Sequence, residues 1–203
     1  MQAFVFGNRS KFYRIDAFFR KEKYTEAASI LESAAIRPAN QSTSSALYLA
    51  GIAYFKAKKS YPAEQQLTRL LRSYPKSKYA HEAKYHRAIL YLKKYDETQK
   101  RAGVETLLSL AADRRRGNLA QDASMAVRQF LFYDAKASFL QQLFDGASPN
   151  DRQVLAEALA YRLVKTGQQE AARAVYTQLK NKSGTSPFLE TMLGSAAEEA
   201  LKP

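Results

Sequence analysis

Two histidines, His81 and His86, carry the only imidazole groups of the chain, and the chain has no cysteine. An imidazole can serve as a general base or as a metal ligand, but both uses need further groups held close to it. The two histidines are five residues apart, so they do not share one face of a helix, and no pair of carboxylates is spaced to complete a metal site. Glu82 lies next to His81 in the sequence, but we expect it to point elsewhere. We therefore predict no catalytic residue, no metal site and no cofactor, and we expect both histidines to line a surface or a groove.

The other charged residues do not form a recognisable catalytic set, and an enzyme is not expected. The sequence has neither a phosphate-binding GxxxxGK[ST] motif nor an order of residues that suggests a serine–histidine–aspartate triad. Asp145, Asp151 and Glu157 gather around a turn, where we expect helix caps and solvated surface. The run Arg114–Arg116 could hold a phosphate or an acidic partner, although a cluster of charge at the end of a helix explains it more simply. The same simple explanation applies to the basic residues Lys56, Lys58 and Lys59.

Positive charge is concentrated in the first half of the chain. Residues 1–101 carry 20 basic and 8 acidic side chains, whereas residues 102–203 carry 12 and 11. This asymmetry indicates that the first half meets an acidic partner; the alternative is a charged surface that only keeps the protein soluble. Lysine and tyrosine also interleave between Tyr74 and Tyr95, which suits nucleic acid because bases stack on aromatic rings and phosphates meet cations. Tyr54 and Tyr91 fall at packing positions of the repeat described next, which weakens the nucleic-acid interpretation.

The spacing of small and apolar residues in the stretch 45–78 predicts a pair of helices. Pro75 ends the second helix, because proline has no amide hydrogen and disfavours a helical conformation in the residue before it. Small residues and tyrosine on the first helix, alanine on the second and a closing proline, all within about 34 residues, are typical of a tetratricopeptide unit. The residues at these positions are Leu47, Ala50, Gly51, Tyr54, Ala63, Leu67 and Pro75.

The same layout recurs along the chain. Ala27 and Ala63 are 36 residues apart, as are Leu31 and Leu67, and Tyr85 follows Tyr48 after 37 residues. We predict an all-α fold, a single right-handed α-solenoid over residues 1–203 with about five helical pairs and a C-terminal capping helix. The pairs are expected at residues 8–41, 45–78, 79–116, 118–146 and 150–182, and the capping helix at residues 186–201. A connection to a further domain is the alternative role of the last helix.

Local signals predict several helix ends. We expect Thr25 to be the N-cap of the second helix, and Asn150 or Asp151 to cap the first helix of the fifth pair. Ser186–Pro187 is expected to begin the last helix, with serine as the cap and proline in the first turn. Residues 96–99 are expected to form the polar centre of a longer loop.

The junction between the second and third pairs carries a family resemblance, through Tyr74, Pro75, Ser77, Tyr79 and Ala80. The stretch 73–98 resembles the tetratricopeptide units of bacterial cell-envelope proteins, among them the outer-membrane lipoprotein of the β-barrel assembly machinery and the periplasmic coordinator of the Tol-Pal system. The resemblance extends over about residues 8–112. It implies a scaffold that binds another protein in the periplasm or at the periplasmic face of the outer membrane, with the cytoplasm as the alternative. The chain shows no apolar run that could span a membrane, no signal peptide and no lipid-anchor cysteine, so an export signal or anchor would have to precede Met1.

In stacks of this kind the first helix of each pair lines a concave surface, and residues one step from the packing positions point into it. We expect these residues to bind an acidic and apolar segment of another protein, with no small-molecule substrate. The alternative is that several of them pack against neighbouring helices. Two other functions stay open: a nucleic-acid binder that uses the basic first half, and an accessory or regulatory domain of a larger envelope protein or enzyme. The predicted partner-binding residues are Phe12, Asp16, Phe19, Arg20, Tyr48, Ile52, Phe55, Lys56, Tyr85, Ile89, Leu92 and Lys93.

Overall fold

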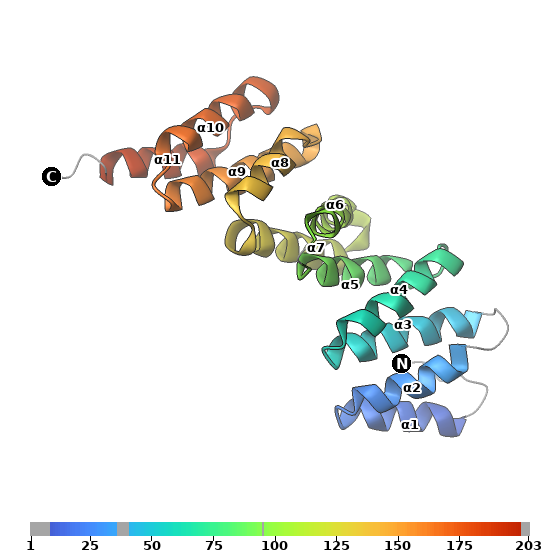
Figure 1. Ribbon diagram of the computed structural model, residues 1–203. Helices are drawn as coiled ribbons and strands as arrows, with labels where there is room; N and C mark the ends of the chain where they lie inside the picture. The colour runs from blue at the N-terminus through green and yellow to red at the C-terminus, as the bar shows by residue number, and fades with distance from the viewer. Residues whose placement is uncertain (1–8, 36–40, 95, 200–203) are drawn as a thin grey trace. The chain divides into compact units, whose positions relative to one another are not determined.

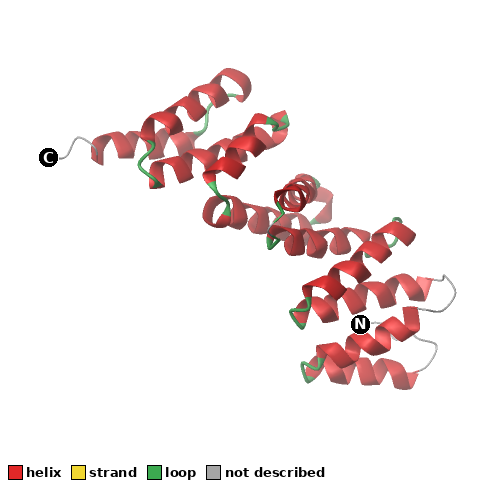
Figure 2. Cartoon of the chain, viewed as in Figure 1, coloured by secondary structure: helices red, strands yellow, loops and turns green. Residues whose placement is uncertain are grey.

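The fold is entirely helical where the structure describes it. The computed structural model describes residues 9–35, 41–94 and 96–199, and Figure 2 shows helices and loops but no strand in these ranges. The all-α class predicted from the helical spacing is therefore confirmed. A 3₁₀ turn (η2, Arg114–Arg116) and a π-helical turn (η3, Phe130–Asp134) flank α7. The helices are α1 (Arg9–Arg20), α2 (Tyr24–Ala35), α3 (Gln41–Lys56), α4 (Ser60–Ser73), α5 (Ala80–Leu92), α6 (Glu97–Ala112), α7 (Asn118–Gln129), α8 (Ala137–Asp145), α9 (Pro149–Lys165), α10 (Gln169–Ser183) and α11 (Pro187–Glu199).

Contacts between residues divide the chain into two compact units, with the division at Leu110 and Ala111 inside α6. In the first unit, consecutive helices pack on one another from α1 to α5, and α3 also contacts α5 (Figure 1). Contacts of this kind, with the next helix and the next but one, occur in stacks of helical pairs. The second unit is built around α9, which contacts α8, α10, α11 and η3. The single continuous solenoid expected over residues 1–203 stays a prediction.

Leucines fill the centre of the first unit, and small residues let its helices approach closely. Leu47 and Leu67 are fully buried in one cluster. Gly51 of α3 faces Leu67 of α4, and a Cβ atom at position 51 would lie 2.7 Å from Leu67 Cδ2. Gly103 of α6 approaches α5 in the same way, since a Cβ atom there would lie 3.0 Å from the carbonyl oxygen of Ala88. The small residue at position 51 is thus required by the packing of α3 on α4.

The turns that join α1 to α2 and α3 to α4 have the same geometry. Glu22 and Lys58 both lie in the left-handed region, with φ values of 55° and 58°. In each turn the next amide donates a hydrogen bond to a carbonyl oxygen five residues earlier, at 2.8 and 2.9 Å, which is the pattern of a helix C-cap. Gly167 takes the corresponding place after α9, with a φ of 76°. The 36-residue spacing of the sequence therefore recurs in the backbone, and Lys58 has a structural role in its turn.

The second unit buries a carboxylate that the sequence pattern places at the surface. Glu157 is only 6% exposed, because residues 155–160 of α9 are all buried. Glu157 Oε1 accepts hydrogen bonds from Ser186 Oγ at 2.9 Å and from Gln153 Nε2 at 3.0 Å, and its Oε2 lies 3.7 Å from the guanidinium of Arg128. The expectation of a solvated Glu157 is wrong, because its partners include residues distant in sequence, on α7 and at the start of α11.

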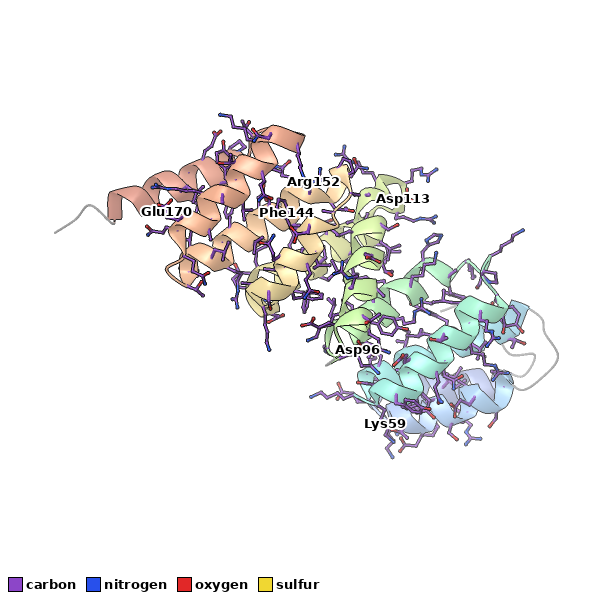
Figure 3. All side chains as sticks on the ribbon, turned by 45° about the horizontal axis from the view of Figure 1, so that its top comes forward. Lys59, Asp96, Asp113, Phe144, Arg152 and Glu170 are labelled. Atoms are coloured by element: carbon purple, nitrogen blue, oxygen red, sulfur yellow. The ribbon has the colours of Figure 1, made fainter. Side chains whose placement is uncertain are left out.

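Capping contacts define the starts of α6 and α11. Asp96 Oδ1 accepts the amide of Thr98 at 2.8 Å, and α6 begins directly after Asp96, which is labelled in Figure 3. The loop expected at residues 96–99 is therefore wrong, because an aspartate at this place caps a helix and shortens the loop. Ser186 caps α11 as predicted, since its Oγ accepts the amide of Leu189 at 3.3 Å.

The caps expected for α2 and α9 are corrected. The helix α2 begins one residue before Thr25, which therefore lies in the first turn. The cap of α9 is Ser148, followed by Pro149 at the first helical position, and not Asn150 or Asp151. Ser148 Oγ accepts the amide of Asp151 at 3.3 Å and donates to its Oδ2 at 2.7 Å. This reciprocal pair satisfies the helix start and explains why the cap lies before the proline.

We expect Gly51→Ala to lower the free energy of unfolding of the first unit, because the added Cβ must displace the fully buried Leu67 side chain. Overpacking of this kind costs about 1–3 kcal/mol. Gly194→Ala is the matched control: nothing lies within 4 Å of a Cβ there, and alanine favours a helix over glycine by about 1 kcal/mol. Urea unfolding followed by circular dichroism measures both changes. If Gly51→Ala is as stable as the original chain, α3 and α4 do not approach as closely as described.

Candidate functional site

A cluster of aromatic rings joins α3 to α5 around His86. The His86 ring lies 5.1 Å from Tyr85 and 5.2 Å from Phe55, centroid to centroid, in edge-to-face arrangements at 75° and 63°. Tyr48 stacks on Tyr79 at 4.8 Å and 11°, and lies 6.4 Å from His86. Each such contact adds about 0.5–1.5 kcal/mol beyond the area it buries, so the rings tie the two helices together. We call these five residues the His86 cluster.

Helix periodicity explains why these rings meet. Tyr48 and Phe55 are seven residues apart on α3, and Tyr79 and His86 are seven residues apart across the start of α5. Seven residues make about two turns of a helix, so the members of each pair lie on the same face. The contact between α3 and α5 brings these two faces together.

Two exposed lysines border the His86 cluster. Lys93 Nζ lies 6.0 Å from the centroid of the Phe55 ring, within the range of a cation–π contact. Lys56 Nζ lies 5.6 Å from the centroid of the Tyr24 ring, and its charge also acts on His86. Neither lysine forms an ion pair with a carboxylate of the residues that the structure describes. Both cations can therefore meet carboxylates of a partner.

Burial keeps the centre of the cluster uncharged near neutral pH. Burial, and after it the charge of Lys56, lowers the pKa of His86 to about 4. Burial, followed by the charges of Glu82 and Tyr79, raises the pKa of Tyr48 to about 12. His86 Nδ1 and Glu82 Oε2, one turn apart on α5, are both shielded from solvent and have no hydrogen-bond partner within the described residues. Because general acid–base catalysis works best with a pKa near the ambient pH, this arrangement suits binding better than proton transfer.

The predicted residues of α1 whose side chains are described lie outside the His86 cluster. Asp16 and Arg20 form an ion pair with each other at 2.8 Å, and the Arg20 side chain is 80% exposed. Phe19 packs into the hydrophobic core and against Tyr24, with ring centroids 5.7 Å apart. The side chain of Phe12 lies outside the described residues. Phe19 thus has a packing role, which is the alternative that the sequence left open.

Some of the predicted residues of α3 and α5 belong to the His86 cluster or border it, and the others do not. Ile52 and Ile89 are partly buried. Ile52 lies four residues after Tyr48, and Ile89 lies three residues after His86, so each is one helical turn from a residue of the cluster. Leu92 packs toward α6, because its Cδ2 would lie 3.2 Å from a Cβ atom at Gly103. The predicted residues that belong to the cluster or border it are Tyr48, Phe55, Lys56, Tyr85 and Lys93.

Three residues of this region are missing from the predicted set, namely Tyr79, Glu82 and His86. His86 lies in the middle of the rings, and Glu82 acts on the hydroxyl of Tyr48 by raising its pKa. Spacing carries a signal for them: Glu82 is four residues and Tyr79 seven residues before His86, which puts all three on one helix face. What spacing cannot show is that this face meets α3.

The charged side chains outside the His86 cluster do not gather into a metal site in the described chain. Within the described residues no group of three or more histidine, aspartate or glutamate side chains could hold a metal ion, and none of the helices there has the length and apolar character needed to cross a membrane. Arg115 and Arg116 pair with Asp113, labelled in Figure 3, at 2.9 and 3.0 Å, so both have an acidic partner in the turn that follows α6. An open pocket of about 550 Å³ runs along α4, and the described residues that line it all come from that helix.

Comparison with known proteins gives no match, either to a protein-family model or to a curated protein. The function is therefore inferred from the fold and from the His86 cluster.

We expect the stability of the first unit to fall as the pH drops from about 6.5 to about 4. The pKa of His86 is lower in the folded chain, at about 4, than the usual value of 6.5, so the unfolded chain takes up the proton first. The stabilisation is complete above the unfolded value and is lost as the pH falls toward the folded value; the loss is at most about 3 kcal/mol. His86→Phe should remove this part of the pH dependence, and His81→Gln should keep it. Urea unfolding at a series of pH values measures the difference.

An NMR titration tests the same assignment directly, because the chain has only two histidines. The signal that disappears in His86→Phe is expected to titrate near pH 4. A midpoint close to the ordinary value of about 6.5 for that signal would contradict the burial of His86.

Proposed function

We propose that the chain is a non-enzymatic adaptor with tetratricopeptide-like architecture, which binds an acidic and apolar segment of another protein. The helix ranges, the recurring turn geometry and the contact of α3 with α5 support stacked helical pairs in the first unit. The proposed architecture extends this stack to a right-handed solenoid of about five pairs, with α11 as its capping helix. The resemblance of residues 8–112 to cell-envelope repeat proteins supports a role in envelope assembly, in the periplasm or at the periplasmic face of the outer membrane.

The observation that carries the proposal is the His86 cluster together with its two lysines. Tyr48, Phe55 and Tyr85 are only partly buried, so a partner can cover the remaining ring surface. Rings already held by their neighbours lose little conformational freedom on binding, which is why aromatic residues often dominate interfaces. Lys56 and Lys93 lie at the border of these rings and are exposed. A segment with apolar side chains for the rings and carboxylates for the lysines complements both features.

The neutral state of His86 indicates where the acidic and the apolar side chains of the partner would bind. With a pKa of about 4, the imidazole adds no positive charge to the centre of the cluster near neutral pH. Attraction for carboxylates is therefore strongest at the border, at Lys56 and Lys93, and the centre favours an apolar anchor. We infer a segment whose acidic residues flank an aliphatic or aromatic side chain.

A nucleic-acid function is supported less well. It is favoured by the excess of basic residues in the first half and by Lys78 Nζ, which lies 5.1 Å from the centroid of the Tyr79 ring. However, Tyr48 and Tyr79 stack on each other, so each covers a ring face that a base would need. The hydroxyl of Tyr54 donates to Glu32 Oε2 at 2.9 Å, which ties this tyrosine to the fold.

We expect Phe55→Ala/Tyr85→Ala to weaken partner capture about fivefold to thirtyfold, because it removes two ring surfaces worth about 1–2 kcal/mol together. Cross-linking and affinity capture from the native envelope fraction, with mass-spectrometric quantification, measure the change. Tyr61→Ala is the matched control, since Tyr61 is 68% exposed on α4 and does not belong to the cluster.

Lys56→Glu/Lys93→Glu is a second variant that leaves the rings in place, and it should reduce capture by repelling the acidic partner. Unchanged capture in both double variants, with the helical circular dichroism retained, would overturn the proposal that the partner binds at the His86 cluster. Binding to oligothymidylate that weakens steeply with salt and is lost in the lysine variant would support the nucleic-acid alternative instead.

A further inference from the structure

A second row of aromatic rings lies in the second unit and takes no part in the proposed function. Phe132 of η3 is at its centre, with ring centroids 5.6 Å from Tyr161 of α9 and 5.9 Å from Phe188 of α11. Tyr133 extends the row and lies 6.4 Å from Tyr161. These four residues, from three elements of one unit, are called the Phe132 cluster.

The two ends of this row are exposed to solvent. Phe132 is only 9% exposed, whereas Tyr133 is 61% and Phe188 is 43% exposed. The other large apolar side chains with this degree of exposure in the described residues are Tyr61 and Met125. Exposed aromatic side chains that gather on a buried ring mark an interaction surface better than single exposed residues do.

The π-helical turn η3 accounts for the exposure of Tyr133. The Ala135 amide donates to the Phe130 carbonyl oxygen at 2.9 Å, five residues earlier, so the turn holds one residue more than an α-helical turn. Phe130, Leu131 and Phe132 are all buried within it, and Tyr133 follows at the surface. Turns of this kind are rare in proteins, and those that do occur are often found at functional sites.

Three cations lie against this row. The guanidinium carbon of Arg128 is 5.3 Å from the centroid of Phe132, and Lys165 Nζ is 5.8 Å from the centroid of Tyr161. Arg162 Nη1 lies 3.4 Å from the backbone carbonyl oxygen of Tyr133 and donates to it. The positive charges thus surround the aromatic surface at distances typical of cation–π contacts or of a long hydrogen bond.

These cations keep most of their capacity to attract an anion. Arg128 is 51% exposed although Glu157 lies 3.7 Å away. Neither Arg162 nor Lys165 forms an ion pair with a carboxylate in the part of the chain that is described. Asp134, in the same turn as Tyr133, is an exposed carboxylate nearby in sequence. Residues 102–203 carry 12 basic and 11 acidic side chains, so the excess of positive charge at this surface is local.

We propose that the Phe132 cluster is a second docking surface, which binds an acidic peptide segment with an aromatic or aliphatic anchor. The anchor packs against Tyr133 and Phe188, and the acidic residues meet Arg128 and Lys165. Charge complementarity selects this occupant, because a basic segment would be repelled by these cations and a neutral one would bring them no carboxylate. The surface uses residues of the second unit alone, so it does not depend on the function proposed for the His86 cluster.

The ring geometry favours a peptide over single-stranded nucleic acid. Phe132 meets Phe188 at 78°, and Tyr133 meets Tyr161 at 70°, so these pairs offer no parallel platform for successive bases. Arg128 and Lys165 already lie over the faces of Phe132 and Tyr161. Side chains of a peptide can fill the angular space between edge-to-face rings, whereas bases need free ring faces.

A random dodecapeptide display library, selected against the full chain and against two variants, tests this proposal. We expect the original chain to enrich peptides that combine aspartate or glutamate with an aromatic or aliphatic residue. One class of these peptides should still be enriched by the Phe55→Ala/Tyr85→Ala variant and should no longer be enriched by the Tyr133→Ala/Phe188→Ala variant. A synthetic peptide of that class should bind about tenfold more weakly to Lys165→Glu in fluorescence anisotropy. Circular dichroism checks the fold of every variant, and the replacement of Tyr133 and Phe188, which are exposed, should preserve it.

The other possible results of the selection show whether the Phe132 cluster, the His86 cluster or neither binds the enriched peptides. If no enriched peptide depends on Tyr133 and Phe188, or if the dependent peptides are basic, the Phe132 cluster is not a docking surface for acidic segments. If all enriched peptides are lost on Phe55→Ala/Tyr85→Ala alone, the proposed function stands and this inference falls. Fluorescein-labelled oligothymidylate is the nucleic-acid probe, and salt-sensitive binding that disappears in Tyr133→Ala/Phe188→Ala would overturn the peptide assignment.

Discussion

Helix packing in the first unit depends on positions where the side chain is small or absent. Gly51 leaves room for the fully buried Leu67, and Ala50 and Ala53 are fully buried on the same helix. Tyr48 and Phe55 lie three and four residues from Gly51 on the same helix, so the two rings flank this close approach; both are only partly buried, and both contact His86 of α5. The His86 cluster therefore lies beside the closest approach of α3 to α4: Gly51 lets Leu67 of α4 come close, and the rings next to Gly51 along α3 contact His86 of α5.

The His86 cluster and the Phe132 cluster share one physical arrangement. In each, a central ring packs edge-to-face against a neighbour, and cations lie near the surrounding aromatic surface. Burial lowers the pKa of His86 to about 4, so this imidazole is uncharged near neutral pH. The ring of Phe132, at the centre of the other cluster, carries no charge at any pH. At the two proposed docking surfaces, a neutral centre with a charged border would let apolar contact supply affinity while the charges orient the partner and exclude basic segments.

Local periodicity predicts the elements of this fold well, and the contacts it misses are long-range. Ala63 and Leu67 are buried where the 36-residue spacing puts them, because a helix face repeats every three to four residues whatever surrounds it. Glu157 could not be predicted in this way, since its buried carboxylate is satisfied by Ser186, 29 residues further along the chain. The central place of His86 among the rings could not be predicted for the same reason: its immediate neighbours show a helix face, but the rings that bury it belong partly to α3. Spacing thus put Tyr48, Phe55 and Tyr85 in the predicted partner-binding set, which stays a prediction, but it could not indicate that these rings gather around His86.

Charges act over longer distances than ring contacts do, so charges affect mainly the association rate and ring contacts mainly the dissociation rate. Opposite charges attract across about a Debye length, roughly 8 Å at physiological ionic strength, whereas rings must touch the partner. Residues 1–101 carry 20 basic and 8 acidic side chains, so the first unit attracts an acidic segment before any specific contact forms, which raises the association rate. In the nearly balanced second half, an approaching segment is attracted mainly by the local cations of the Phe132 cluster, such as Arg128 and Lys165. Added salt should therefore slow association at the His86 cluster more than at the Phe132 cluster, while the ring contacts, which set the dissociation rates, change little at either surface.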